Sequence, residues 1–206
     1  VMISEGEVGA LDLVRHFEGK KKIEEIDGIA WKENGQMRVN PKMNFIKNLD
    51  EIPFPAIDLL PLQNYWDLGY AHGPFEGKYS FLMTSRGCPF GCHFCATPSL
   101  WQRKWRARSP RNIVDEMEHF QRKFGINDYH IQDDIFTVNT PRVIEFCKEL
   151  INRKLDVTWQ VLSTKAETVS IEALHWMKKA GCDYLSVSPE TGSPELVKKM
   201  NKPFDY

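Results

Sequence analysis

The stretch that decides the fold of this chain is residues 79–95, which read YSFLMTSRGCPFGCHFC. Its first six residues are largely apolar and predict a short buried strand. Three cysteines follow closely, Cys88, Cys92 and Cys95, in the spacing C-x3-C-x2-C. The chain has five cysteines, and the other two stand alone. This odd number is a poor disulfide framework, and a tight group of thiols indicates metal or redox chemistry instead.

The spacing of these cysteines favours an iron–sulfur cluster. A loop of this length can wrap three thiolates around one face of a 4Fe-4S cubane, whereas most such clusters are held by four cysteines. Three ligands leave one iron with an open site, and open metal sites bind and activate substrate. A zinc site completed by His93 or by a distant ligand is an alternative interpretation, as are three merely buried thiols.

Downstream of the cysteines, strand and helix patterns alternate, which indicates a parallel sheet or barrel built from βα units. Loops that follow the strands' carboxyl ends form the working face of such a fold, so the cysteines stand where chemistry is expected. We therefore predict an α/β fold, a partial (β/α) barrel of about four βα units. Further strands are predicted at 129–132, 157–162 and 184–187, and helix starts at Ser109-Pro110, Thr140-Pro141, Ser170 and Ser193-Pro194.

The residues before 78 do not continue the alternating strand and helix pattern. Residues 1–17 look like a strand end and a helix, and residues 23–39 look like a β-hairpin around Asn34-Gly35. Residues 41–77 form a proline- and glycine-rich connection. We expect a linker here, with a fragment of another domain ahead of it.

Composition excludes several classes of function. Lys and Arg number 27 against 28 Asp and Glu among 206 residues, so the nearly neutral field gives no reason to expect nucleic acid or an acidic membrane as a partner. No apolar run approaches the roughly 20 residues of a membrane helix, and residues 1–13 lack the layout of a signal peptide. We expect a cytoplasmic protein.

The cysteine motif resembles that of the radical S-adenosylmethionine (radical SAM) superfamily, in which an aromatic residue, here Phe94, directly precedes the last cysteine. The likeness covers about residues 78–202, and it is closest to the subfamily associated with a cobalamin (B12)-binding domain. Residues 4–7 and 49–56 are similar to the end of that domain and its linker. The further segments of likeness are Thr84-Ser85-Arg86-Gly87, Arg108-Ser109-Pro110, Asp133-Asp134-Ile135-Phe136-Thr137 and Glu190-Thr191-Gly192-Ser193.

This resemblance implies two cofactors and a reaction type. A 4Fe-4S cluster on Cys88, Cys92 and Cys95 would be chelated by the amino and carboxylate groups of S-adenosylmethionine. Reductive cleavage would then give methionine and a 5′-deoxyadenosyl radical that abstracts hydrogen from a substrate. A reductase or a flavodoxin- or ferredoxin-type protein would donate the electron. Methyl transfer is the commonest reaction implied, and methylthiolation and oxidative cyclisation share these motifs.

Candidate cofactor-binding residues follow from the same resemblance, each with a simpler alternative. Phe94 would pack near the adenine, or would belong to the core. Glu190 would hydrogen-bond the ribose or the amino group, or would cap the next helix. At least one of Asp133 and Asp134 should face the cavity because strand side chains alternate, or both would stabilise a turn. Arg108 is chosen to balance cluster or cofactor charge.

The resemblance also sets expected domain boundaries. Residues 1–40 would be the remnant of a cobalamin-binding-like domain, 41–77 a linker, and 78–206 an incomplete radical SAM core. None of the six histidines lies in a cobalt-binding motif, which would stand before Val1, so cobalamin is expected only in a longer protein. Six βα units are expected in such a barrel, and we count four. We therefore expect a fragment cut at both ends, prone to aggregate along its uncovered sheet edge.

Two other functions compete with the enzyme. A zinc-binding module would use the cysteines together with residues 101–111, where basic side chains alternate with Trp101 and Trp105 as in nucleic-acid-binding surfaces. A catalytically inactive fragment would keep the fold alone. Iron content separates the first alternative from a cluster, and formation of 5′-deoxyadenosine tests the second.

Overall fold

The computed structural model describes residues 1–69, 73–75 and 77–202 of the chain. Its internal contacts divide the chain into two compact units, Val1–Lys47 and Asn48–Tyr206. The first unit has a two-stranded sheet, and the second unit has a four-stranded sheet and a further two-stranded one. The cysteine loop belongs to the second unit.

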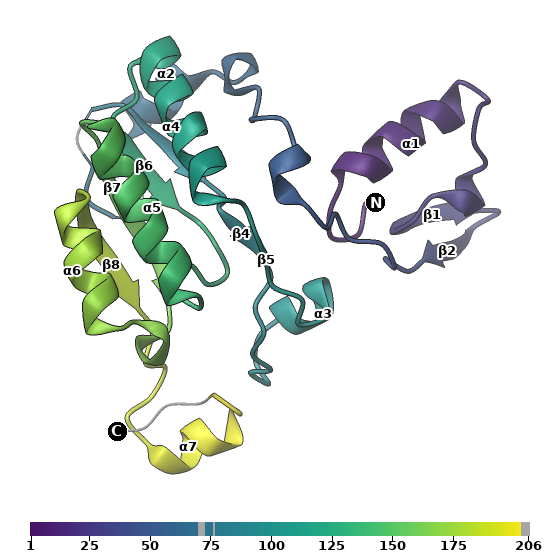
Figure 1. The fold of residues 1–206 in the computed structure, drawn as a ribbon. Coiled ribbons are helices and arrows are strands. Elements are labelled where there is room, and N and C mark those ends of the chain that lie inside the picture. Colours follow the sequence, from purple (N-terminus) through teal and green to yellow (C-terminus); the bar gives the residue numbers. More distant parts are fainter. Residues whose placement is uncertain (70–72, 76, 203–206) are drawn as a thin grey trace. The chain divides into compact units, whose positions relative to one another are not determined.

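The first unit combines a helix with a β-hairpin (Figure 1). Strands β1 and β2 are antiparallel, with Glu33 opposite Gln36. Asn34 and Gly35 between them have φ of +47° and +81°, as a type I′ turn requires. The hairpin predicted around this dipeptide is therefore confirmed. The elements of this unit are α1 (Glu7–Phe17), the 3-10 turn η1 (Ile23–Glu25), β1 (Ile29–Glu33) and β2 (Gln36–Asn40).

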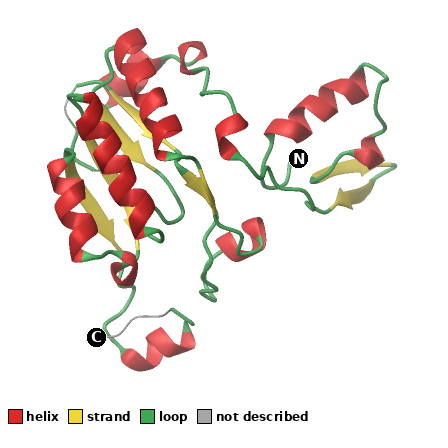
Figure 2. Cartoon of the chain, viewed as in Figure 1, coloured by secondary structure: helices red, strands yellow, loops and turns green. Residues whose placement is uncertain are grey.

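A parallel sheet in the order β3-β6-β7-β8 forms the centre of the second unit. Tyr79 lies opposite Asp128, which lies opposite Thr158 on the next strand. Helices α4, α5 and α6 pack side by side over one face of the sheet (Figure 2). The predicted βα architecture is confirmed. The strands are β3 (Tyr79–Leu82), β6 (Asp128–Ile131), β7 (Thr158–Thr164) and β8 (Cys182–Val187).

Side-chain caps start the four helices that begin after residue 109, because the first amides of a helix lack backbone partners. Ser109, Ser170 and Ser193 each accept a hydrogen bond from the amide three residues on, as predicted. The predicted cap Thr140 is wrong, because the side chain of Asn139 accepts from the amide of Arg142 and Thr140 is already helical. The helices are α4 (Pro110–Phe124), α5 (Thr140–Arg153), α6 (Ile171–Lys179) and α7 (Pro194–Lys199).

The core lies between the sheet and these helices. Trp159 of β7 is fully buried, and its ring meets the rings of Phe136 and Phe146 edge-on at 5.8 and 5.1 Å between centroids. The isolated thiols of Cys147 and Cys182 are buried in the same core, as expected. Burial raises the pKa of each to about 12, so neither is a ready thiolate ligand.

Residues expected to form a connection carry short structured elements that belong to the second unit. Ile57 lies in the core, and the indole of Trp66 donates to the carbonyl of Tyr79 at 2.9 Å. The carboxylate of Asp50 accepts from the amide of Ser109 at 2.8 Å, where α4 begins. The elements are η2 (Leu49–Glu51), η3 (Ile57–Leu59) and α2 (Leu62–Leu68).

Candidate cofactor site

The cysteine loop leaves the sheet just beyond the carboxyl end of β3 (Figure 1). The chain there forms the short strand β4 (Ser85–Arg86), which pairs antiparallel with β5 (Arg106–Ala107), and the loop between them carries the cysteines and helix α3 (Thr97–Trp101). Gly87 opens the loop with φ of +85°. A Cβ at this position would lie 2.1 Å from the carbonyl oxygen of Lys104. Only glycine fits where the loop begins.

Cys88, Cys92 and Cys95 all line one cavity of about 210 Å³. Cys88 is half-buried, Cys92 is buried and Cys95 is exposed, and all three thiols are free. Residues that follow β6, β7 and β8 complete the lining. Side chains from the carboxyl ends of successive parallel strands therefore meet beside the three sulfurs.

Asp133 holds the end of β3 and does not line this cavity. Its carboxylate accepts hydrogen bonds from the amide and hydroxyl of Thr84, at 2.6 and 2.5 Å, and from the hydroxyl of Ser85 at 2.6 Å. Burial raises the pKa of Asp133, and the nearby guanidinium of Arg142 opposes that rise. The residue ties the strand after which the loop begins to the end of β6.

Asp134, the next residue, lines the cavity and joins the two ends of the cysteine loop. One carboxylate oxygen accepts from the amide of Gly87 at 2.9 Å, directly before Cys88. The other accepts from the hydroxyl of Thr97 at 3.2 Å, two residues after Cys95. The two adjacent carboxylates thus have different tasks, although both lie beyond the end of β6 at Ile131, so strand alternation does not account for the difference.

Lys165, directly after β7, brings an ammonium to the cavity. Its Nζ is buried without a hydrogen-bond partner in the described structure and lies 4.2 Å from the centroid of the Phe90 ring. Burial raises the pKa of Cys88, while the amide of Phe90 and the charge of Lys165 oppose that rise. The cavity therefore contains a cation close to the first cysteine.

Glu190 and Lys202 face each other in the same cavity. The Nζ of Lys202 lies 2.9 Å from Oε1 of Glu190, and it also donates to the carbonyl of Ser188. Lys202 is only 4% exposed, so this ion pair is shielded from solvent on the lysine side. The expected cofactor residue Glu190 thus has one oxygen already fixed by a partner within the chain.

Two other candidates lie in contrasting surroundings. Phe94 lines the cavity with its side chain more than half exposed. Arg108 is outside the lining and forms a buried ion pair with Glu116, while its Nε donates to Asn112 at 2.6 Å. The structure therefore gathers the three cysteines with Phe94, Asp134 and Glu190, and it leaves Asp133 and Arg108 outside the cavity.

Sequence reasoning missed Lys165, Thr97 and Lys202. Lys165 and Thr97 had a weak signal, because one follows a predicted strand and the other follows the last cysteine. No sequence signal marked Lys202, because only the turn after α7 brings its side chain to Glu190.

The basic stretch 101–111 is folded into contacts within the chain. The guanidinium of Arg106 lies 5.6 Å from the ring centroid of Trp101, and the indole of Trp105 donates to the carbonyl of Ile135 at 3.3 Å. Arg108 pairs with Glu116. These contacts hold Arg106, Arg108 and the two tryptophans within the chain, whereas Arg103, Lys104 and Arg111 are exposed.

The thiols suit a cluster better than a single ion. In the part of the chain that the structure describes, no three His, Cys, Asp or Glu side chains are gathered as ligands for one metal ion. A zinc site needs four donors converging on one point, whereas a cubane takes each thiolate on a different iron atom. Three thiols that line one cavity, with an unpaired ammonium beside them, are a donor set for the larger group.

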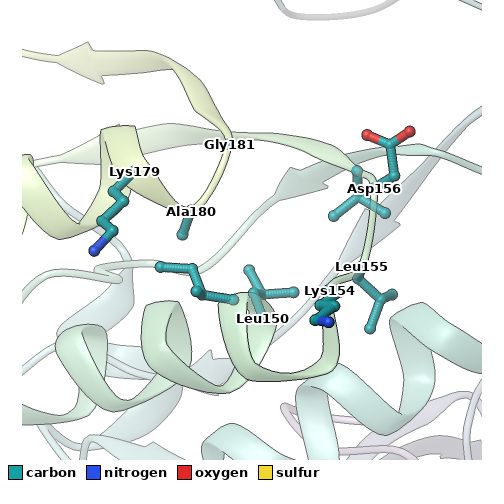
Figure 3. Close-up of a pocket in the computed structure, with 9 residues that line it drawn as sticks. Leu150, Lys154, Leu155, Asp156, Lys179, Ala180 and Gly181 are labelled. Carbon is teal, nitrogen blue, oxygen red and sulfur yellow. The ribbon is translucent and has the colours of Figure 1, made fainter.

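A second cavity, of about 270 Å³, lies at the opposite ends of the strands (Figure 3). The segments that enter β7 and β8 line it, with Leu150, Leu155 and Ala180 as apolar walls and the side chains of Lys154 and Lys179 at its edges. It contains neither thiol nor carboxylate cluster. The chemistry-bearing residues are therefore concentrated at the carboxyl ends.

Comparison with known proteins agrees with this fold and site. Residues 82–206 match the family described as the Radical SAM superfamily. This match covers more than half of the chain, so the chain belongs to the radical SAM superfamily. The family predicted from the cysteine motif is confirmed, and zinc binding is not favoured.

Two of the curated relatives that are named as methyltransferases match nearly the whole chain. The chain is 32% identical over 202 residues to an uncharacterized methyltransferase of Pyrococcus horikoshii, covering 98% of this chain and 42% of the relative. It is 27% identical over 226 residues to the cytidylyl-2-hydroxyethylphosphonate methyltransferase of Streptomyces wedmorensis, again covering 98% and 42%. The chain thus spans about two fifths of the length of these relatives.

Solved structures share the fold at low identity. The cobalamin-dependent S-adenosylmethionine radical enzyme OxsB superposes with a TM-score of 0.79 at 23% identity, covering 98% of this chain and 29% of that one. The radical S-adenosylmethionine methyltransferase TsrM of Kitasatospora setae gives 0.77 at 17% identity, covering 95% and 38%. The partial barrel predicted from sequence is the arrangement found in these enzymes.

Helices long and apolar enough to cross a membrane are absent from the described residues.

Proposed function

We propose that this chain is the cofactor-binding part of a radical SAM enzyme, in which Cys88, Cys92 and Cys95 hold a 4Fe-4S cluster and the adjoining cavity receives S-adenosylmethionine. The observation that carries the proposal is the meeting of these thiols with Asp134 and Glu190 on one cavity at the carboxyl ends of parallel strands. Reductive cleavage of S-adenosylmethionine is the chemistry that the cluster supplies when bound.

The chain's own residues position the cofactors. Asp134 holds both ends of the cysteine loop, so the three sulfurs start from a restricted geometry. Glu190, kept in place by Lys202, offers its second oxygen to the ribose or amino group. Phe94 offers an exposed ring for the adenine.

Charge balance supports the same assignment. A cluster held by three thiolates would add net negative charge to a cavity that already holds two carboxylates, and buried negative charge needs compensation. The sequence suggested Arg108 for this task, but its guanidinium is engaged with Glu116. Lys165 has a buried ammonium beside Cys88 and no hydrogen-bond partner in the described structure. We therefore assign charge compensation to Lys165.

Methyl transfer is the reaction we propose for the whole protein, because a relative that is 32% identical over 98% of this chain is named as a methyltransferase. Anaerobic magnesium-protoporphyrin IX monomethyl ester cyclase of Rubrivivax gelatinosus, 28% identical over 207 residues, represents the competing oxidative cyclisation. For the full-length protein we also propose that cobalamin is a cofactor and that a reductase or a flavodoxin- or ferredoxin-type protein donates the electron. We propose that this protein is cytoplasmic.

Anaerobic reconstitution of the chain with iron and sulfide tests the cluster. The wild-type chain should become brown and bind about four irons per chain. Alanine at Cys88, Cys92 or Cys95 should abolish this absorption, whereas the control Cys182→Ala, in a buried core thiol outside the cavity, should retain it. Bound zinc without colour, or full iron content in the three cavity variants, would refute the proposal.

Cofactor cleavage is tested separately. The reconstituted chain, given S-adenosylmethionine and a strong reductant, should form 5′-deoxyadenosine. Glu190→Gln should weaken the binding of S-adenosylmethionine while iron content stays that of the wild type, because Glu190 touches the cavity but is not a cluster ligand. Formation of a full cluster without any binding of S-adenosylmethionine would limit the chain to a cluster-binding fragment.

A further inference from the structure

The turn after helix α7 is a Schellman motif. The amide of Lys202 donates to the carbonyl of Val197 at 3.2 Å, and the amide of Asn201 donates to the carbonyl of Lys198 at 3.1 Å. Asn201 has φ of +51°, the left-handed conformation that this motif requires and that asparagine tolerates. These two bonds satisfy only two of the last four carbonyls of the helix.

His93 supplies partners for the other two carbonyls. Its backbone amide donates to the carbonyl of Met200 at 2.9 Å, and its Nδ1 lies 3.0 Å from the carbonyl of Lys199. A carbonyl only accepts, so Nδ1 carries the proton in this contact. A histidine from the cysteine loop therefore caps the end of a helix more than a hundred residues further along the chain.

A third hydrogen bond runs in the opposite direction. The side-chain amide of Asn201 donates to the carbonyl of Gly91 at 2.9 Å, directly before Cys92. His93 follows Cys92 on its other side. The middle cysteine is thus flanked on both sides by residues that contact the end of α7. We call these three hydrogen bonds the His93–Asn201 clamp.

The same helix end carries the Glu190–Lys202 ion pair of the cavity, which is buried on the lysine side. Lys202 follows Asn201 directly, and its ammonium contacts Glu190 at 2.9 Å and the carbonyl of Ser188. One segment, residues 188–202, therefore presents Glu190 and Lys202 to the cavity and also grips the loop around Cys92. Any displacement of the loop changes the support of both charged side chains.

We propose that His93 and Asn201 are positioning residues that couple the cysteine loop to the Glu190–Lys202 pair, so that cluster loading orders the segment that binds S-adenosylmethionine. This inference rests on the proposed function and goes beyond it, because neither residue lines the cavity. Both side chains are exposed, so each bond makes a modest contribution, about fivefold in an equilibrium constant.

The clamp is tested first in the metal-free chain by amide hydrogen exchange. Asn201→Gly keeps the left-handed turn but removes the bond to Gly91, and His93→Phe removes the Nδ1 donor while keeping a ring. Both substitutions should speed exchange of the backbone amide of residue 93 by about fivefold. His93→Asn, whose side-chain amide replaces Nδ1, should restore protection, and His175→Phe, at an exposed histidine of α6, should change nothing.

The coupling is tested after anaerobic loading with iron and sulfide. In the wild type, loading should slow amide exchange across residues 194–202. His93→Phe and Asn201→Gly should keep the iron content yet lose this added protection and bind S-adenosylmethionine about fivefold more weakly by equilibrium dialysis. His93→Asn should again restore both properties.

The outcomes separate the two proposals. A wild-type chain that takes up no cluster overturns the proposed function, whatever the exchange data show. Unchanged exchange of the His93 amide in both variants overturns the clamp. A normal cluster with wild-type affinity for S-adenosylmethionine in His93→Phe and Asn201→Gly overturns the coupling, and so does loss of the cluster itself in these variants.

Discussion

Two neighbouring carboxylates, Asp133 and Asp134, differ in burial and in the groups that they contact. Asp133 is buried with three accepted hydrogen bonds, whereas Asp134 reaches the cavity and holds Gly87 and Thr97. Asp133→Ala leaves the buried amide and hydroxyl of Thr84 without their acceptor, and it leaves the buried Ser85 hydroxyl only its longer bond, at 3.4 Å, to the carbonyl of Ile135. We expect it to lower the free energy of unfolding by roughly 3 kcal/mol or more.

Asp134→Ala should act locally instead. The free energy of unfolding should fall by only about 1 kcal/mol, while reconstituted protein should lose iron to a chelator faster than the wild type. Urea unfolding and iron release measured on both variants distinguish the two roles. Equal effects of the two substitutions on unfolding would contradict the division of tasks.

Arg108 and Glu116 form the second residue-scale case. Their ion pair is buried, with Glu116 only 1% exposed. Arg108→Met leaves a buried carboxylate without its partner, and breaking such a pair costs about 3–5 kcal/mol. The double variant Arg108→Met with Glu116→Gln should be more stable in urea than the single variant. Additive losses would show that the pair is not coupled.

At the scale of elements, the structure decides which of two adjacent residues, Asn139 or Thr140, caps the start of α5. Asn139 accepts the amide of Arg142, and Thr140 is the first helical residue. Asn139→Ala should therefore reduce the free energy of unfolding by about 1 kcal/mol. Thr140→Ala should change it by less than about half of that, as is usual for surface substitutions. A larger loss for Thr140→Ala than for Asn139→Ala in thermal or urea unfolding would show that Thr140 is the cap.

Strands and long helices were predictable because their signals are local. Short apolar segments placed all four parallel strands within a few residues, and Ser109, Ser170 and Ser193 marked the helix starts. The pair β4 and β5 was not predicted, since each strand has two residues and forms only by pairing across the cysteine loop. Pairing between distant residues leaves no periodic pattern to find.

The cavity was only partly predictable for the same reason. Spacing marks the three cysteines, and strand ends mark Asp134. Lys202 enters through a turn twelve residues beyond Glu190, and the pairing of Arg108 with Glu116 depends on how α4 packs. Ion pairs of this kind are set by tertiary packing, which a single sequence does not display.

Acid should affect the two units of the molecule differently. The hydrogen bond from Lys21, at 2.6 Å, holds the pKa of Asp12 in the first unit below its usual value. In the second unit, burial raises the pKa of Glu116. Unfolded Asp and Glu titrate near about 3.9 and 4.3. Asp12 therefore stabilises above about pH 3.9 and loses this contribution as pH falls through its lower folded pKa.

Glu116 has the opposite sign, because its folded state holds the proton more tightly and gains stability as pH falls toward about 4.3. We expect the first unit to unfold at a higher pH than the second during acidification. The indole resonances of Trp31, in the first unit, and Trp159, in the second, report the two transitions. Asp12→Asn should weaken the first unit at neutral pH and flatten its acid transition. Coincident transitions of the two indoles would contradict this expectation.

The carboxylate of Asp134 has a consequence for transplanting the motif. It fastens Gly87 and Thr97, the residues at the neck of the loop, to a strand that begins more than thirty residues after Cys95. Grafting residues 88–95 alone onto another scaffold would transfer the sulfur ligands but not the two hydrogen bonds that hold the ends of the loop together. The portable unit is residues 87–97 together with an acid just beyond the end of the neighbouring strand.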